Sequence, residues 1–321
     1  MTILVVGDAN ADLSAALASF PREGDDVLVA GMGWHSGGSA ANVATALARL
    51  GEAVRLIARV GRDPAAEVAL QIARAAGVDL SRIQYDTTTP TGLCLAAISP
   101  SGERTLFSFR GANVALELGP QDTTLLEHVD WLHIAGHALL EGTQRASVEW
   151  LWKQNIAHPT HVPMSLDLCL PLVQHRREEL LAMLPSIQVL FANELELATL
   201  FPEHDLQAAT DTPAYLKDSL VVVKRGADGC VVVHAGERLL VPAFSVDAVD
   251  TTGCGDAFVA GFLLAHLRRA SPQECATLAN AVGALAATQP GAAEALPSRA
   301  QVRAFLGDHA LTALLYDQAV S

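Results

Sequence analysis

The chain has 321 residues, of which 50% are hydrophobic, 5% aromatic and 17% charged, enough apolar material for a sizeable core in one large α/β domain. Its formal net charge of −14, with no basic cluster along the chain, argues against a nucleic-acid partner. No apolar run reaches membrane-spanning length and no secretory signal precedes the first strand-like run, so we expect a cytoplasmic protein without a membrane partner.

Short strand-like runs rich in Val, Ile and Leu alternate with helix-length segments rich in Ala and Leu. This alternation predicts an α/β fold with a doubly wound, mainly parallel sheet flanked by helices. The expected strands cover residues 3–6, 54–60, 131–135, 164–167, 189–192 and 220–224, with a further strand-like patch at 239–249. The expected helices cover residues 40–50, 64–76, 145–154, 177–184, 256–268, 272–288 and 299–306.

Two segments interrupt this alternation. Residues 92–99 and 103–110 are strand-like runs joined by Pro-Ser-Gly at 100–102, which is a hairpin signal. Residues 12–36 lack helical periodicity and contain a short extended run at 27–30. We expect the insertions at about 12–36 and 92–110 to form a small β lid within a single domain spanning residues 1–321.

The segment V-D-T-T-G-C-G-D-A-F at residues 249–258 carries the most chemical information. Gly253 and Gly255 on either side of Cys254 allow an anion to approach the backbone, and the first amides of the following helix point outward as an anion hole. Asp256 then stands beside that anion, where it can accept the proton of a hydroxyl that attacks a phosphoryl group. On spacing alone, an N-cap aspartate after a glycine turn explains the segment equally well.

Five short elements resemble, in order and spacing, the motifs of the PfkB, or ribokinase-like, carbohydrate kinases. D-T-T-G-C-G-D at 250–256 resembles the family signature D-T-x-G-A-G-D. The other elements are G-D-A-N-A-D at 7–12, G-G-S-A-A-N at 37–42, N-E-L-E at 193–196 and K-R-G-A-D-G at 224–229. The match runs from about residue 7 to residue 297. It implies a ribokinase-like fold and transfer of the γ-phosphoryl group of ATP to a sugar hydroxyl.

The resemblance also implies a role for each matching residue. Asp256 becomes the general base, with the amides of Gly253, Cys254 and Gly255 as the anion hole, and Glu196 acts on Mg²⁺ through water. The implied substrate-binding residues are Asn10, Asp12, Gly37, Gly38, Asn42 and Arg110. The implied nucleotide-binding residues are Asn193, Lys224, Gly226, Gly229, Asn280, Thr288 and Gly291. Without the motifs, Asp12 reads as a turn residue, and Asn42 and Glu196 as ordinary helix residues.

The sequence departs from the family pattern at two informative places. Many members hold a monovalent cation, and Asp250 with Thr252, Ala287 and Gly291 matches that site, but Ala295 replaces the expected serine, which leaves potassium activation open. Cys254 replaces the usual alanine of the anion hole, and a thiol at a helix N-terminus has a raised reactivity.

The acceptor is less constrained than the reaction. Residues 167–171 lack the arginine that members acting on acidic sugars carry there, which favours a neutral pentose or hexose, although Arg110 keeps an acidic sugar open. One alternative is a nucleoside kinase with Trp34, Phe107 and Phe109 as a platform for a base. Another is a catalytically silent sugar-binding regulatory protein. We also expect a homodimer that forms through the lid, on the face that carries Leu93, Leu95 and Ala97.

Overall fold

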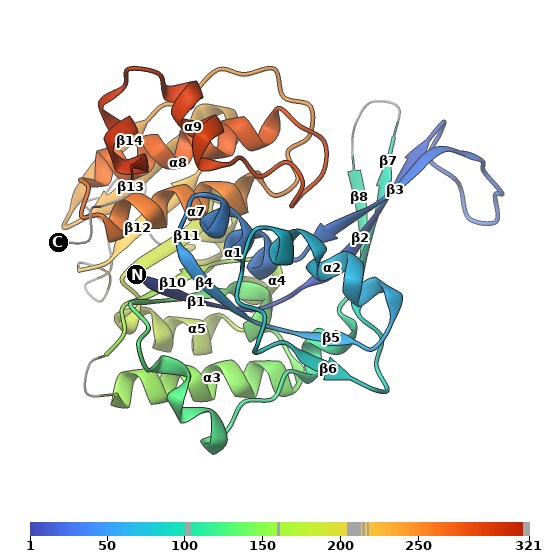
Figure 1. The fold of residues 1–321 in the computed structure, drawn as a ribbon, viewed down its shortest axis with the longest axis horizontal. Helices are drawn as coiled ribbons and strands as arrows, with labels where there is room; N and C mark the ends of the chain where they lie inside the picture. The colour runs from blue at the N-terminus through green and yellow to red at the C-terminus, as the bar shows by residue number, and fades with distance from the viewer. Residues whose placement is uncertain (100–103, 159–160, 204–212, 214–215, 217, 317–321) are drawn as a thin grey trace.

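The computed structural model describes residues 1–99, 104–158, 161–203, 213, 216 and 218–316 (Figure 1). Their main sheet has the strand order β14-β13-β12-β11-β10-β9-β1-β4, parallel from β12 to β4 and antiparallel at β13 and β14. The strands are β1 (Thr2–Val6), β4 (Ala53–Ile57), β9 (Trp131–Ala135), β10 (Met164–Asp167), β11 (Val189–Asn193), β12 (Leu220–Lys224), β13 (Cys230–His234) and β14 (Glu237–Val241). The predicted doubly wound, mainly parallel sheet is confirmed.

Helices cover both faces of this sheet. Within β1, Ile3 and Val5 belong to one hydrophobic core while Leu4 and Val6 belong to the other, because alternate side chains of a strand point to opposite faces. The α-helices are α1 (Ser39–Arg49), α2 (Pro64–Ala75), α3 (Gly142–Ala157), α4 (Leu170–His175), α5 (Arg177–Met183), α6 (Glu194–Leu200), α7 (Cys254–Leu267), α8 (Pro272–Ala287) and α9 (Arg299–Leu306). The 3₁₀ helices are Gly111–Ala115, Pro120–Leu126, Gly136–Leu139, Leu184–Ser186, Gly226–Asp228 and Ala310–Leu315. No helix in the described part of the chain combines the length and apolarity needed to cross a membrane.

The predicted strand at 54–60 and the patch at 239–249 are both shorter in the structure. β4 ends at Ile57, and the chain leaves the main sheet to form β5 (Arg59–Gly61), which pairs with β6 (Gln84–Asp86) in a separate two-stranded sheet. Of the patch at 239–249, only residues 239–241 belong to a strand, β14. The next residue, Pro242, has no N–H to continue the ladder. Sequence reasoning missed β13, α4 and α6. The two helices, of six and seven residues, are too short to show a helical period, whereas β13 carries the apolar run V-V-V at 231–233 that could have been read as a strand.

A second sheet, which we call the lid sheet, stands to one side of the main body beyond α2 (Figure 1). It has the order β3-β2-β7-β8, with β2 (Asn10–Leu17), β3 (Val29–Gly37), β7 (Gly92–Ile98) and β8 (Arg104–Phe109). The pairs β2–β3 and β7–β8 are antiparallel, and β2–β7 is parallel. The predicted turn at 100–102 lies outside the described residues. β3 is longer than the expected run at 27–30, and β2 was not anticipated as a strand.

The two faces of the lid sheet differ in chemistry. Asp12 pairs with His35 across β2 and β3, so both side chains share one face. One residue further along, Leu13 lies level with Trp34 and Leu95, and Leu95 lies level with Phe107, which makes the opposite face apolar. The lid sheet therefore presents a polar face and an apolar face.

Candidate active site

The carboxylate of Asp256 is held by two side chains of α1. Its Oδ1 accepts a hydrogen bond from Ser39 Oγ at 2.7 Å, and its Oδ2 accepts one from Asn42 Nδ2 at 2.8 Å. Burial raises the pKa of Asp256 to about 6, although both hydrogen bonds favour the ionised form and act in the opposite direction. The group is therefore ionised at neutral pH while its pKa is high enough for it to accept a proton. Its neighbour Asn42, expected to contact substrate, thus also positions this carboxylate.

The glycine loop before α7 has the backbone that an anion hole requires. Gly253 is the N-cap, with a left-handed φ of 75°, a conformation that glycine adopts without steric cost. α7 begins at Cys254, whose amide donates to Thr251 O at 3.3 Å, and the first amides of any helix have no carbonyl acceptor within that helix. Asp250 fixes the loop: its Oδ1 accepts from Thr252 N and Thr252 Oγ1 at 2.8 and 2.7 Å, and its Oδ2 accepts from Gly291 N at 3.0 Å.

The residues expected around a monovalent cation also meet at this loop. The carbonyl of Ala287 accepts hydrogen bonds from Val249 N and Asp250 N at 2.7 and 3.2 Å, and Asp250 in turn holds Gly291. The side chain of Ala295 is buried nearby in the same C-terminal segment. Two chain segments, 249–252 and 287–291, which α7 and α8 separate in the sequence, are thereby joined at the glycine loop.

A cavity of about 620 Å³ opens next to the glycine loop. It contains five predicted nucleotide-binding residues and several that the sequence did not single out. Its lining comprises Asn193, Lys224, Gly226, Ala227, Gly229, Ala243, Phe244, Ser245, Val246, Ala248, Thr251, Cys254, Gly255, Phe258, Asn280, Gly283, Ala284 and Ala287. Gly283 and Ala284 lie one helical turn after Asn280, a spacing of small residues that could have been read as a helix face left open for a ligand.

Two predicted nucleotide-binding residues do not line this cavity. Thr288 follows α8, and its hydroxyl donates to Leu285 O at 2.7 Å, so it closes its own helix. Gly291 lies instead among the residues expected around a monovalent cation, where its amide donates to Asp250 Oδ2. Asn280, by contrast, lines the cavity and donates to the carbonyls of Val241 and Pro242 at 3.2 and 3.0 Å, which joins α8 to the end of β14.

Asn193 and Glu196 cap the N-terminus of α6 reciprocally. Asn193 Oδ1 accepts from Glu196 N, and Glu196 Oε2 accepts from Asn193 N, both at 2.8 Å. Burial raises the pKa of Glu196. The N-E-L-E element therefore has a structural role, and of its two predicted site residues Asn193 lines the cavity while Glu196 does not.

Two buried side-chain oxygens near Asp256 have no hydrogen-bond partner among the described residues. Asp12 Oδ1 and Asn42 Oδ1 are both buried in this state. Burial raises the pKa of Asp12 to about 7, and the charges of Glu294 and Asp256 add to the effect. Gly37 and Gly38 leave room here, because a side chain on Gly37 would collide with the Asp12 carboxylate. Asn10 is already engaged, since its Oδ1 accepts from Asn113 Nδ2 at 2.7 Å.

Arg110 is tied down by residues that sequence reasoning overlooked. Its Nη2 donates to both oxygens of Asp8, at 3.0 and 3.1 Å, and to Gln144 Oε1 at 2.6 Å. Asp8 lies inside the G-D-A-N-A-D element, which was a signal that could have been used. The charge of Arg110 is thus balanced by a carboxylate within the protein.

Glu294 links the lid sheet to the C-terminal segment and was also missed. Its Oε1 accepts from Ser36 N at 3.0 Å, and its Oε2 lies 3.7 Å from Nδ1 of His35.

The expected aromatic platform is wrong in its placement. Trp34, Phe107 and Phe109 lie on the face of the lid sheet opposite Asp12, and each has about half of its surface exposed.

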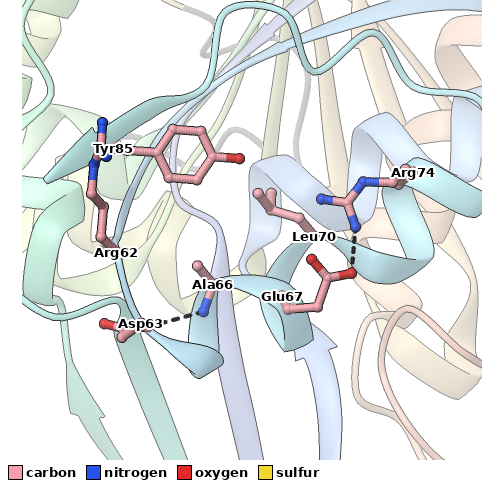
Figure 2. Close-up of a pocket in the computed structure, with 8 residues that line it drawn as sticks. Arg62, Asp63, Ala66, Glu67, Leu70, Arg74 and Tyr85 are labelled. Carbon is pink, nitrogen blue, oxygen red and sulfur yellow. Dashed lines mark hydrogen bonds and ion pairs between the residues drawn. The ribbon is translucent and has the colours of Figure 1, made fainter.

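A different hollow, of about 500 Å³, lies along the outer side of α2 and holds none of the predicted site residues (Figure 2). Three of its charged side chains have structural partners. Asp63 accepts from Ala66 N as the N-cap of α2, and Arg74 pairs with Glu67. Nothing in this hollow matches the chemistry of the glycine loop.

Comparison with known proteins gives concordant results. The family model described as "pfkB family carbohydrate kinase" matches residues 2–299. An ATP-dependent ribose-1-phosphate kinase of Halopiger xanaduensis is 32% identical over 308 residues, which cover 95% of this chain and 98% of that protein. A ribokinase of Haemophilus influenzae is 28% identical over 316 residues, 96% and 99% of the two chains.

Solved structures agree on the fold. A putative ribokinase II from E. coli superposes with a TM-score of 0.83 at 23% identity, over 96% of this chain and 99% of that chain. The Arabidopsis thaliana ribokinase complexed with ribose and ATP gives a TM-score of 0.79 at 25% identity, over 95% and 98%.

Proposed function

The chain belongs to the pfkB family of carbohydrate kinases, and from that premise we propose that it transfers the γ-phosphoryl group of ATP to a hydroxyl of a neutral pentose or hexose. The observation that carries the proposal is the placement of Asp256. Its carboxylate stands in the first turn of α7, next to the glycine loop and beside a cavity of about 620 Å³. That is where an acceptor hydroxyl and a phosphoryl group have to meet.

The proposed reaction balances without a covalent intermediate. Asp256 accepts the proton of the acceptor hydroxyl, and the oxygen forms a bond to the γ-phosphorus. The bond from that phosphorus to the β,γ-bridging oxygen breaks, and ADP leaves with the electron pair. The amides of Gly253, Cys254 and Gly255 stabilise the charge on the transferred group. An oxyanion donor of this kind contributes on the order of 10²–10³ in rate in other enzymes.

Magnesium fits the residues at the cavity in a limited way. Among the described residues there is no group of three His, Cys, Asp or Glu side chains that could hold a metal by itself. Glu196 offers one buried carboxylate, which suits an ion held chiefly by nucleotide phosphates and water. When bound with ATP, Mg²⁺ neutralises phosphate charge, and Glu196 orients its water ligands.

The preference for a neutral acceptor rests on charge. Asp8 already balances Arg110, and the remaining groups near Asp256 are Asp12 and Asn42, whose unpartnered oxygens accept hydrogen bonds from hydroxyls. The negative charge of Asp256, and that of Asp12 in its ionised form, disfavour a phosphate or carboxylate on the acceptor.

A substrate panel with purified protein, ATP and Mg²⁺, read by ADP release, tests the proposal. Neutral sugars, nucleosides and anionic sugars are assayed in parallel, with Asp256→Asn as the control. We expect turnover of a neutral sugar and none in the variant. Turnover confined to nucleosides would favour the nucleoside-kinase alternative. The absence of turnover with every compound, alongside measurable sugar binding, would favour a silent regulatory protein.

We further propose that K⁺ binds at the cluster of Asp250, Thr252, Ala287 and Gly291 and raises the rate by fixing the glycine loop. Comparing rates in K⁺ and in tetramethylammonium at equal ionic strength tests this. Equal rates would show that the replacement of serine by Ala295 has removed the effect.

The apolar face of the lid sheet supports a homodimer. Trp34, Phe107 and Phe109 are exposed there, and a patch of this kind favours burial against a second copy. We expect a dimer in analytical ultracentrifugation and a shift to monomers in Trp34→Ser/Phe107→Ser.

All five cysteines are thiols, as in a reducing, ATP-rich compartment, so we place the enzyme in the cytoplasm.

A further inference from the structure

A buried ion pair links two strand ends beneath the glycine loop. Lys224 ends β12 and Asp167 ends β10, the two strands on either side of β11, so their side chains meet at the carboxyl edge of the sheet. Lys224 Nζ donates to Asp167 Oδ1 at 2.6 Å, with only 18% and 7% of the two side chains exposed. Removing two charges from water is costly, so such a pair is weak evidence for stability and raises the question of function.

The ammonium group of Lys224 lies close to the glycine loop. Its Nζ is 3.6 Å from the point that a Cβ on Gly255 would occupy, so it stands against the first turn of α7. Lys224 also lines the nucleotide cavity. An ammonium has three N–H donors, and the bond to Asp167 uses one of them. Among the described residues Nζ has no other hydrogen-bond partner, which leaves two donors beside the anion hole.

We propose that Lys224 is a catalytic residue that donates to the oxygens of the transferring phosphoryl group, and that Asp167 is a positioning residue that holds it there. The inference rests on the proposed kinase function. A fixed positive charge in a site sheltered from water stabilises developing phosphoryl charge without having to reorganise during the reaction. Asp167 acts only through Lys224 and has no contact with the acceptor.

The charged groups around Lys224 come from four elements. Asp167 of β10, Glu196 of α6 and Asp256 of α7 are carboxylates, and His133 of β9 is fully buried. Burial alone would lower the pKa of Lys224, but the three carboxylates outweigh it and raise that pKa. Burial, followed by the charge of Lys224, lowers the pKa of His133 to about 3, so the imidazole is neutral. Loss of the Asp167 charge therefore makes Lys224 easier to deprotonate.

The test combines kinetics and a pH profile in wild type, Lys224→Met, Asp167→Asn and the double variant. We expect Lys224→Met to lower kcat on the order of 10²–10³, with a small change in the acceptor KM. In Asp167→Asn, the alkaline limb of kcat moves to lower pH, because activity requires the protonated ammonium. Adding Asp167→Asn to Lys224→Met causes no further loss of kcat, since the two residues act as one unit.

A matched control separates this from general damage to a buried ion pair. Glu52 and Arg268 form such a pair at 2.6 Å, with 8% of each side chain exposed, away from the cavity. Glu52→Gln should lower the melting temperature as Asp167→Asn does, yet leave the alkaline limb in place. The inference is overturned if Lys224→Met keeps kcat within about tenfold of wild type, or if Asp167→Asn leaves the limb unmoved. If Asp256→Asn is inactive in the same assay, such a failure leaves the proposed kinase function intact.

Discussion

Replacing Ser39 with alanine should move the acidic limb of the pH–rate profile to higher pH. Ser39 Oγ donates to Asp256 Oδ1 at 2.7 Å, which stabilises the ionised carboxylate and holds down a pKa that burial raises to about 6. A hydrogen bond to a charged group is worth about 1.5–3 kcal/mol, and one pKa unit corresponds to about 1.4 kcal/mol. Because water can take part of the place of the lost hydroxyl, we expect a shift of about one unit.

The sign follows from the protonation state that works. The ionised form of Asp256 accepts the proton, so activity is present above its pKa and is lost as the pH falls through it. The assay measures kcat/KM for the acceptor across the acidic range in wild type and Ser39→Ala. Thr45→Val is the control, because the Thr45 hydroxyl of the same helix donates to Ala41 O and does not touch Asp256. A limb that stays in place in Ser39→Ala, or moves to lower pH, would refute the assignment of Asp256 as the titrating base.

Three further substitutions probe the loop and the cavity. Gly253→Ala forces a side chain into a left-handed conformation, so we expect a loss of about 1–2 kcal/mol in unfolding free energy together with a fall in kcat. Gly307→Ala is the control. Gly307 has a φ of 54° and no neighbour within 4 Å of an added Cβ, so this variant should lose stability alone. Gly283→Leu places side-chain volume in the cavity and should raise the KM for ATP at least about tenfold, for a cost of about 1.4 kcal/mol, with little change for the acceptor. Thiol alkylation should inactivate the wild type with protection by ATP, because Cys254 lines the cavity; equal inactivation of Cys254→Ala would contradict this.

Local signals explain which parts of the fold were predictable. The strands at 3–6 and 189–192 were anticipated because a strand buried on both faces needs a continuous apolar run. The glycine loop was anticipated because the residues that give it its backbone conformation are neighbours in the sequence. Boundaries were less predictable. Residues 54–60 read as one strand, yet the chain changes sheets after Ile57, because β6, whose residues lie 25 positions after their partners in the sequence, pairs with β5.

The placement of side chains depended on tertiary structure. Strand alternation requires Phe107 and Phe109 of β8 to share a face, but whether Trp34 of β3 lies on that face, and whether Asp12 lies on the opposite one, depends on the pairing register of four strands. For the same reason, no pattern in the sequence revealed that Lys224 would meet Asp167, since the two residues lie on strands separated by β11.

The amino-acid sequence by itself determined the class of fold, the family and the segment at 249–258 that carries the chemistry, because hydrophobic period and glycine spacing act over a few neighbouring residues. Only the tertiary structure decided that Ser39 and Asn42 hold Asp256, that Asp8 balances Arg110, and that Asp167 holds Lys224 beside Gly255. Those contacts bring together groups that are distant along the chain, and their pKa values follow from burial that exists only once the layers have packed.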